Sequence, residues 1–258
     1  MNRENTQPTA GTLAPLQAGT VTLVGGGPGD PGLLTVAGLQ ALRQADVVLV
    51  DHLAPQESLA ECSADCEQIW VGKHPRGEFV PQERINELLV THARAGKRVV
   101  RFKGGDNFVF GRGGEEWQAC AAAGVAVRVV PGVTSSVAAP ALAGVPVTHR
   151  NLVQGFTVVS GHVPPGDERS RLDWSALART STTLVVLMGV KYLPEITAEL
   201  IRCGLPATTP VAVVAKAGRP DVTQVRGPLD RIAELASEIS PPAVTIIGEV
   251  AGLDLSAG

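Results

Sequence analysis

Short apolar runs alternate with stretches of helical periodicity along most of the chain. Residues 21–24 and 47–50 are continuous apolar runs, which are typical of strands buried on both faces. Between them, Val36, Leu39 and Leu42 recur at the spacing of one helix face. A strand, a helix and a second strand in this order predict an α/β fold, in which helices cover a parallel sheet.

The same patterns predict the other elements of each half. In the first half we expect strands at 69–71, 98–102 and 125–130, and helices between Pro81 and Gly96 and at 115–123. In the second half we expect strands at 156–159, 184–188, 211–215, 222–225 and 244–247, and a helix at 192–203. Pro131-Gly132 and the small residues after it interrupt this rhythm, which indicates a domain boundary.

We therefore expect three parts: a disordered tail at 1–19, an N-terminal α/β domain at 20–131 and a C-terminal α/β domain at 132–258. Two such lobes would leave a cleft between them, a common place for small ligands. The polar start lacks the apolar segment of a signal peptide, and no run of about 18 apolar residues predicts a membrane span.

Composition excludes several classes of function. The chain has 258 residues, a net charge of −3 and 3% aromatic residues, so it offers neither a basic field nor stacking platforms for nucleic acid. Its cysteines, Cys62, Cys66, Cys120 and Cys203, lack the spacing of a zinc site or a disulfide framework. They predict free thiols in a reducing cytoplasm, and we expect no metal site.

The run 98–116, RVVRFKGGDNFVFGRGGEE, carries the strongest functional signal. An apolar strand ends in Lys103, and Gly104, Gly105 and Asp106 follow at its carboxyl end, where open α/β sheets bind ligands. Two adjacent glycines mark a place where the backbone approaches a neighbour closely. The loop therefore has the composition of an active site.

Three predicted strands of the first half end in polar residues. Asp51, Lys73 and Asp106 follow successive strands, and parallel strands bring their carboxyl ends to one edge of the sheet. Asp51, beside His52, is a candidate proton acceptor, and its alternative role is to cap a short helix. The alternative for Lys73 is a solvated side chain. Together the three positions favour one shared site.

Further polar residues interrupt apolar sequence. Thr134 and Ser135 open a helix, where the threonine caps the helix and is also a candidate ligand contact. A His-Arg pair suits carboxylate binding, and the alternative is a solvated rim. The basic residues that would form such a cationic patch are Arg76, Arg101, Lys103, Arg112, His149 and Arg150.

One glycine pattern suggests a different hypothesis, a dinucleotide-binding site. Gly27, Gly29 and Gly32 match G-x-G-x-x-G of dinucleotide-binding proteins. Pro28 and Pro31 remove amide donors that a pyrophosphate needs, which argues against a nicotinamide or flavin site. A tight strand-to-helix turn without a ligand is the other alternative.

The chain closely resembles the uroporphyrinogen-III C-methyltransferases of the tetrapyrrole methylase (class III) superfamily, from about residue 20 to 250. The motifs that carry the resemblance are VGGGPGDPGLLT, ADVVLVDHL, VGK, KGGDNFVFGRGGEE, VVPGVTSSVAAPALAGVPVTHR, SGH, LMGV and PAVTIIG. The departures are Gly26 in place of Ala, Asn107 in place of Pro and Val109 in place of Ile. Because the dehydrogenase and ferrochelatase module of some relatives is not in this sequence, we expect a stand-alone methylase.

The resemblance implies S-adenosylmethionine-dependent C-methylation of uroporphyrinogen III at C2 and C7, which gives precorrin-2 and S-adenosylhomocysteine for sirohaem or cobalamin. It implies Asp51 as proton acceptor, Lys73 as proton donor and a cytoplasmic homodimer. The implied cofactor-binding residues are Pro28, Gly104, Gly105, Asp106, Val109, Thr134, Ser135, Met188 and Ala217. We assign the substrate carboxylates to Arg101, Arg112, His149, Arg150 and His162.

Three other functions stay open at this point. A later-stage precorrin methylase or a non-tetrapyrrole methylase would use the same cofactor on another substrate. A ligand-binding or sensor module would use the same cleft without turnover. A nicotinamide oxidoreductase is the third, and an NAD titration would detect it.

Overall fold

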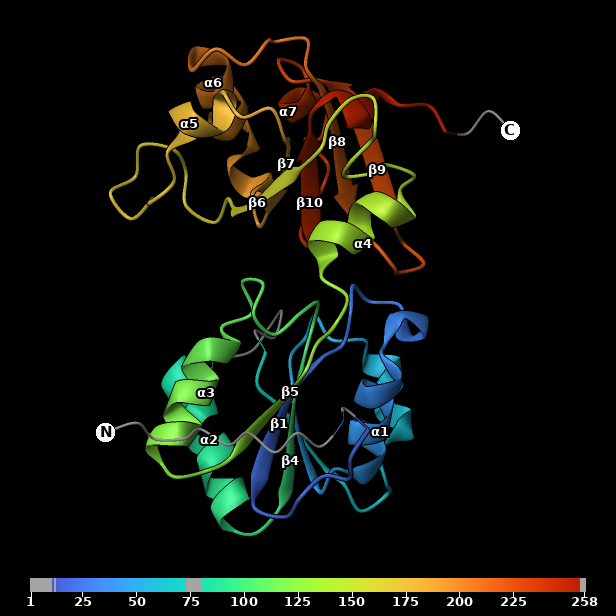
Figure 1. The fold of residues 1–258 in the computed structure, drawn as a ribbon, viewed down its shortest axis with the longest axis vertical. Coiled ribbons are helices and arrows are strands. Elements are labelled where there is room, and N and C mark those ends of the chain that lie inside the picture. The colour runs from blue at the N-terminus through green and yellow to red at the C-terminus, as the bar shows by residue number, and fades with distance from the viewer. Residues whose placement is uncertain (1–10, 12, 73–79, 256–258) are drawn as a thin grey trace. The chain divides into compact units, whose positions relative to one another are not determined.

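The computed structural model describes residues 11, 13–72 and 80–255. The chain forms two compact units, one of Met1–Gly27 and Pro31–Val133, the other of Pro28–Asp30 and Thr134–Gly258. The short segment Pro28–Asp30 thus belongs to the second unit, although it follows the first strand of the first. Figure 1 shows the elements of each unit and labels those for which there is room.

The first unit is built on five parallel strands, in the order β3-β2-β4-β1-β5. This result confirms the α/β class and the parallel sheet that the sequence predicts. Its elements are β1 (Thr20–Gly25), α1 (Val36–Gln44), β2 (Val47–Val50), β3 (Glu67–Trp70), α2 (Gln82–Arg94), β4 (Arg98–Lys103), α3 (Gly113–Ala122) and β5 (Val127–Val130).

Helices cover both faces of this sheet. On one face, Leu42 of α1 packs in a buried cluster with Val48 of β2 and Phe102 of β4. On the other face, Leu89 of α2 and Cys120 of α3 pack in a second cluster with β1, β2 and β4. Figure 1 shows α1 on one side of β1 and β4, and α2 and α3 on the other. Burial on both faces explains why β2 is a continuous apolar run.

The second unit has a mixed sheet, in the order β6-β7-β10-β8-β9. Strands β6 and β7 are parallel, whereas β10 is antiparallel to both β7 and β8, and β8 is antiparallel to β9. Its elements are α4 (Ser135–Leu142), β6 (Phe156–Ser160), α5 (Trp174–Ala178), β7 (Thr183–Leu187), α6 (Leu193–Arg202), β8 (Pro210–Ala215), β9 (Thr223–Pro228), α7 (Ile232–Leu235) and β10 (Ala243–Ile247). The sequence did not predict α5 or α7, which are short.

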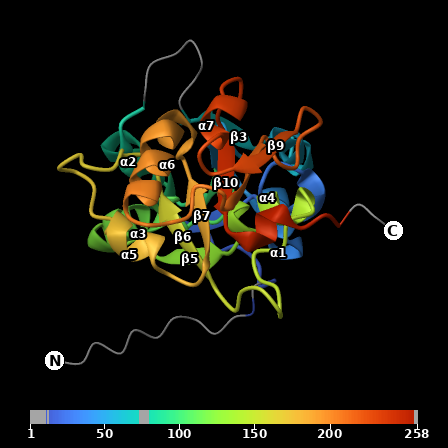
Figure 2. The same ribbon diagram turned by 90° about the horizontal axis from the view of Figure 1, so that it is seen from above.

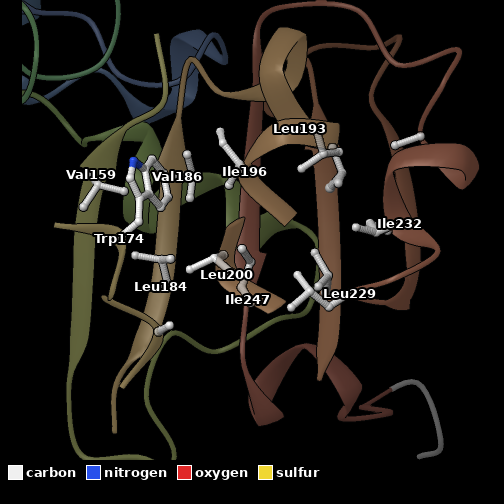
Figure 3. Packing of buried hydrophobic residues seen from close by; sticks show 14 residues of the cluster. Val159, Trp174, Leu184, Val186, Leu193, Ile196, Leu200, Leu229, Ile232 and Ile247 are labelled. Atoms are coloured by element: carbon white, nitrogen blue, oxygen red, sulfur yellow. The ribbon is translucent and has the colours of Figure 1, made fainter. Parts of the chain in front are cut away.

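Two apolar clusters hold this sheet between helices. Trp174 of α5, and Ile196 and Leu200 of α6, pack against Val186 of β7 and its neighbours (Figure 3). On the other face, α4 packs against β7, β8 and β10. Figure 2 shows α6 and α4 on opposite sides of β7 and β10. The unit is therefore a three-layer structure with one helical layer on each face.

Residues 13–19, directly before β1, differ from the expected disordered tail, whereas residues 1–10 and 12 of that tail lie outside the described residues. Leu16 is buried in the cluster of α1, and its amide donates to Oε1 of Gln44 at 2.9 Å. A guanidinium nitrogen of Arg128 donates to the carbonyl of Ala14 at 2.6 Å. These contacts fix the residues directly before β1 against the first unit. Over residues 11, 13–72 and 80–255, no helix is long and apolar enough to cross a membrane.

Candidate functional site

The carboxyl edge of the first sheet brings the ends of β2 and β4 together. The amide of Asp51 donates to the carbonyl of Phe102 at 2.9 Å, which continues the parallel ladder one residue beyond β2. The Gly104-Gly105-Asp106 loop leaves the same edge after β4. The prediction that Asp51 and Asp106 follow strands of one parallel sheet and lie at its carboxyl edge is therefore confirmed, whereas Lys73 and Arg76 lie outside the described residues.

Asp51 is a largely shielded carboxylate at this edge. Its Oδ1 lies 3.0 Å from Nδ1 of His52, and its side chain is 26% exposed. Burial by itself raises the pKa of Asp51, but the hydrogen bond with His52 and the positive charges of Arg101 and Lys103 together outweigh burial. The pKa of Asp51 is lowered from its ordinary value as a result. The side chain is therefore an ionised carboxylate near neutral pH.

The glycines of the loop serve close contact between backbone segments. Gly105 and Gly27 exchange two hydrogen bonds, from Gly105 N to Gly27 O at 2.6 Å and from Gly27 N to Gly105 O at 3.1 Å. A Cβ on Gly104 would lie 2.7 Å from the carbonyl oxygen of Leu53, and a Cβ on Gly132 would lie 2.2 Å from that of Gly105. Larger residues would force these segments apart.

Asp106 ties this loop together through its carboxylate. Oδ1 accepts from the amides of Phe108 at 2.8 Å and Val109 at 3.2 Å, and Oδ2 accepts from the amide of Gly132 at 3.1 Å. The acceptor predicted for a ligand is thus also the acceptor that orders the loop. Val109, a predicted cofactor contact, takes its backbone position from this turn.

Asn107, one of the departures from the family pattern, is fully buried. Its Nδ2 donates to the carbonyl of Leu23 at 3.3 Å and to that of Val130 at 3.0 Å, so it joins β1 to β5. Its Oδ1 is buried without a hydrogen-bond partner. The residue therefore has a bridging role in this chain that a proline could not take.

The prediction that Arg101 binds substrate carboxylates is wrong for this fold. Its side chain is 4% exposed, and its Nε donates to Oε1 of Glu116 at 2.9 Å. Lys103 is equally buried, and its Nζ donates to both oxygens of Glu116, at 2.8 and 2.9 Å. Both cations are committed to an internal carboxylate, so neither joins a cationic patch on the surface.

Sequence reasoning missed Glu116 as a site residue. A signal was present, because Glu116 and Cys120 are four residues apart on α3 and share one helix face. Both are buried. An acidic residue on the apolar face of a helix needs a charged or hydrogen-bonding partner. The position of Glu116 on that face therefore predicts that a basic residue of the sheet packs against α3.

Arg112, at the start of α3, remains a candidate for binding substrate carboxylates because its side chain is at the surface. It adopts a left-handed backbone conformation, with φ 57°, and its guanidinium is half exposed. It pairs with Glu115, at 2.9 Å from Nε and 2.6 Å from a terminal nitrogen. The exposed side chains of Phe108 and Phe110 lie in the same loop. This part of the first unit presents a cation together with apolar surface.

The second unit gathers the carboxyl ends of β6, β7 and β8 at one edge, because β7 and β8 are both antiparallel to β10. Met188 follows β7 with φ 58° and is 48% exposed. Ala217 lies just past β8, and Pro28–Asp30 packs against the same turn: a Cβ on Gly218 would lie 3.4 Å from Cγ of Pro28. Three predicted cofactor contacts, Pro28, Met188 and Ala217, thus belong to this unit.

The second unit also carries the other predicted residues. Oγ1 of Thr134 caps α4 by accepting from the amide of Ser136 at 3.3 Å, so the capping role is confirmed. Ser135 is the first residue of α4. His162 follows β6, and its Nδ1 lies 2.8 Å from Oγ of Ser160. His149 and the exposed Arg150 lie in a turn after α4, where Nδ1 of His149 accepts from Asn151 N at 3.3 Å.

The local geometry does not support the hypothesis that Gly27, Gly29 and Gly32 bind a dinucleotide. After β1 the chain forms the 3-10 helix Pro31–Leu33, and α1 begins only at Val36. The glycine pattern therefore does not open a helix whose amides could face a pyrophosphate. Gly29 instead belongs to the second unit and packs against Arg219 there, since a Cβ on Gly29 would lie 3.1 Å from Cγ of Arg219.

The two sheets and their helices define an α/β protein. In each unit, loops that carry predicted site residues follow the carboxyl ends of strands. A family model for tetrapyrrole (corrin/porphyrin) methylases matches residues 20–233. The chain therefore belongs to the tetrapyrrole methylase family.

Two solved structures resemble the chain across nearly their whole length. One is uroporphyrin-III C-methyl transferase from Thermus thermophilus, complexed with S-adenosyl homocysteine: 44% identity, TM-score 0.78, 90% of this chain and 99% of that one. The other is a cobalt precorrin-4 methyltransferase: 30% identity, TM-score 0.80, 90% and 96%.

A curated relative is longer. Siroheme synthase 1 of Yersinia pseudotuberculosis is 50% identical over 236 residues, which make up 91% of this chain and 49% of that protein. The chain thus spans about half the length of the curated relatives it matches.

Proposed function

We propose that the protein is an S-adenosylmethionine-dependent C-methyltransferase that methylates uroporphyrinogen III at C2 and C7, giving precorrin-2 and S-adenosylhomocysteine. The observation that carries the proposal is the 44% identity to the Thermus thermophilus enzyme over 99% of that chain. That relative is named as a uroporphyrin-III C-methyl transferase and was solved with S-adenosyl homocysteine.

The residues of the two edges suit such a cofactor. Met188, which follows β7, offers exposed apolar surface for a nucleoside, and the small Ala217 follows β8 at the same edge of the second sheet. The first unit offers a loop whose backbone is fixed by Asp106, with Gly104, Gly105 and Val109 around it. We propose that these residues, with Pro28, Thr134 and Ser135, hold the cofactor. S-adenosylmethionine would supply an electrophilic methyl group there.

In the proposed reaction a carbon of a reduced pyrrole ring attacks the methyl carbon in line, the carbon–sulfur bond breaks, and its electron pair stays on sulfur. The ring system then loses a proton. Because the sulfonium is already reactive, alignment supplies the largest part of the acceleration, roughly 7–11 kcal/mol. Acid–base groups add a factor of about 10²–10⁴.

Asp51 is the proposed proton acceptor. Its lowered pKa makes the carboxylate a weak base, which fits a supporting rather than a dominant share of the acceleration. We keep Lys73 as the proposed proton donor. For the eight carboxylates of the substrate, we propose Arg112, His149, Arg150 and His162. We further expect the protein to be cytoplasmic and to form a homodimer. Light scattering tests the homodimer, which has twice the mass of one chain.

Transfer of a labelled methyl group tests the proposal. The protein is incubated with methyl-labelled S-adenosylmethionine and, separately, uroporphyrinogen III, a later-stage precorrin and a non-tetrapyrrole acceptor. We expect label in the uroporphyrinogen III reaction. Preference for the precorrin would instead support a later-stage methylase, which the likeness to cobalt precorrin-4 methyltransferase makes the second candidate. Cofactor binding without any labelled product would favour a sensor.

A further inference from the structure

Three charged side chains are buried behind the carboxyl edge of the first sheet. Glu116 has no exposed surface, and Arg101 and Lys103 are each 4% exposed. Glu116 accepts one hydrogen bond from Arg101, at 2.9 Å, and two from Lys103, at 2.8 and 2.9 Å. The proposed reaction uses none of these groups directly, because a macrocycle cannot reach them.

Strand β4 and helix α3 bring these three charged groups into contact. Arg101 and Lys103 are two residues apart on β4, so they point to the same face of the sheet. Glu116 faces them from the first turns of α3, and Nε2 of Gln82, at the start of α2, lies 3.4 Å from its Oε1. Arg101 also donates to the carbonyls of Leu49 and Phe102, at 3.3 Å each. Arg101 is therefore held by α3, β2 and β4, whereas Lys103 is held by both oxygens of Glu116.

The cluster carries an excess of positive charge. Two cations share one carboxylate, so the sum is one positive charge in a place shielded from water. A buried charge without a counter-ion is costly. A candidate to balance it is Asp51, which follows β2 and whose amide donates to the carbonyl of Phe102, the residue between Arg101 and Lys103. The charges of both cations act on Asp51, and the charge of Asp51 acts back on Lys103.

We propose that Arg101, Lys103 and Glu116 are positioning residues that keep the carboxylate of Asp51 ionised and in place, with Glu116 orienting the two cations. The proposal rests on the proposed role of Asp51 in methyl transfer. Among the described residues, the charged or titratable groups that act on Asp51 are His52 from its own loop and the two cations from β4. Glu116 acts through those cations.

The composition of the cluster allows a clean test. Arg101→Met leaves Lys103 paired with Glu116, and Lys103→Met leaves Arg101 paired with Glu116. Each variant removes the excess charge but leaves no buried charge alone. Lys103→Arg keeps the charge. Arg98→Met is the matched control, because Arg98 lies at the other end of β4 and pairs with Asp46.

The readout is the titration of Asp51 itself, followed by its carboxyl ¹³C resonance and assigned with Asp51→Asn. We expect the midpoint to move up by about 1 pH unit in Arg101→Met and in Lys103→Met, since each removes a nearby opposite charge. It should stay in place in Lys103→Arg and Arg98→Met. An unchanged midpoint in both methionine variants, with a native fold by circular dichroism, overturns the proposal.

The pH dependence of kcat/KM separates this proposal from the proposed function. If Asp51 takes part in methyl transfer, the acid limb moves up together with the resonance in the two methionine variants. A shifted resonance with an unmoved acid limb supports the electrostatic role of the cluster and overturns the catalytic role of Asp51.

Discussion

Oδ2 of Asp106 accepts a hydrogen bond from the amide of Gly132, 26 residues further along the chain, at 3.1 Å. The other oxygen, Oδ1, organises the turn at Phe108 and Val109. One carboxylate thus links the loop after β4 to the segment after β5. The loop proposed to hold the cofactor depends on this link.

Substitution of Asp106 should weaken cofactor binding in a graded way. Asp106→Asn keeps an acceptor for the turn but loses the one for Gly132, and Asp106→Ala loses both. Hydrogen bonds to a charged group contribute about 1.5–3 kcal/mol each, so we expect roughly a tenfold or greater loss in affinity for the alanine variant. Calorimetric titration with S-adenosylhomocysteine measures it. Wild-type affinity in Asp106→Ala would refute the assigned role.

Loss of Glu116 should destabilise the first unit strongly. Glu116→Gln leaves two buried cations without their carboxylate, and breaking a buried ion pair costs about 3–5 kcal/mol. The neighbouring Glu115 pairs with Arg112 at the surface, so Glu115→Gln should cost only about 0–1 kcal/mol. Urea unfolding of both variants gives the comparison. Equal stabilities would mean that the cluster contributes little to folding.

Acid should weaken the fold through Asp46. Hydrogen bonds and charge from Arg98 outweigh burial and lower the pKa of Asp46 from 3.8 to about 2. A lowered folded-state pKa gives stability that is present above pH 3.8 and is lost as the pH falls through about 2. Because both side chains are partly exposed, we expect only about 1 kcal/mol.

The variant Asp46→Asn isolates the contribution of the Asp46 charge to the free energy of unfolding. The variant should be less stable than the wild type near neutral pH, and the difference should shrink between pH 4 and pH 2. Thermal unfolding at a series of pH values measures the difference. A difference that does not change with pH would show that charge at Asp46 is not its source.

Arg150 should affect the substrate more than the cofactor. Its side chain is exposed in the turn after α4, and loss of one charge-assisted hydrogen bond to a carboxylate raises KM by about tenfold. Steady-state kinetics of Arg150→Ala gives KM for uroporphyrinogen III, and calorimetry gives the cofactor affinity. Arg202→Ala on α6 is the control, since it pairs only with neighbours on its own surface. Equal losses for substrate and cofactor would count against carboxylate binding.

The apolar pattern predicted the strands well because most of them are buried on both faces. A run such as Val47–Val50 has the same composition in either direction, however, so the pattern could not show that β10 runs antiparallel to its neighbours. Short helices such as α7 span too few residues to display a helical period.

The candidate site was predicted in part. Asp51 and Asp106 lie at one edge of the sheet as expected, because parallel strands share one carboxyl edge, and the structure adds that their strands are adjacent. The error at Arg101 arose because a strand sequence shows which side chains share a face but not what covers that face. Only the docking of α3 reveals Glu116 as the partner. Asn107 likewise took its bridging role from the pairing of β1 with β5.

The mass of the macrocycle after turnover tests the central claim most directly. Uroporphyrinogen III is incubated with the protein and an excess of methyl-labelled S-adenosylmethionine, and the tetrapyrrole is analysed by mass spectrometry. The account predicts a product with two labelled methyl groups, formed with S-adenosylhomocysteine. An unchanged macrocycle, recovered from a folded protein that binds S-adenosylhomocysteine, would contradict it.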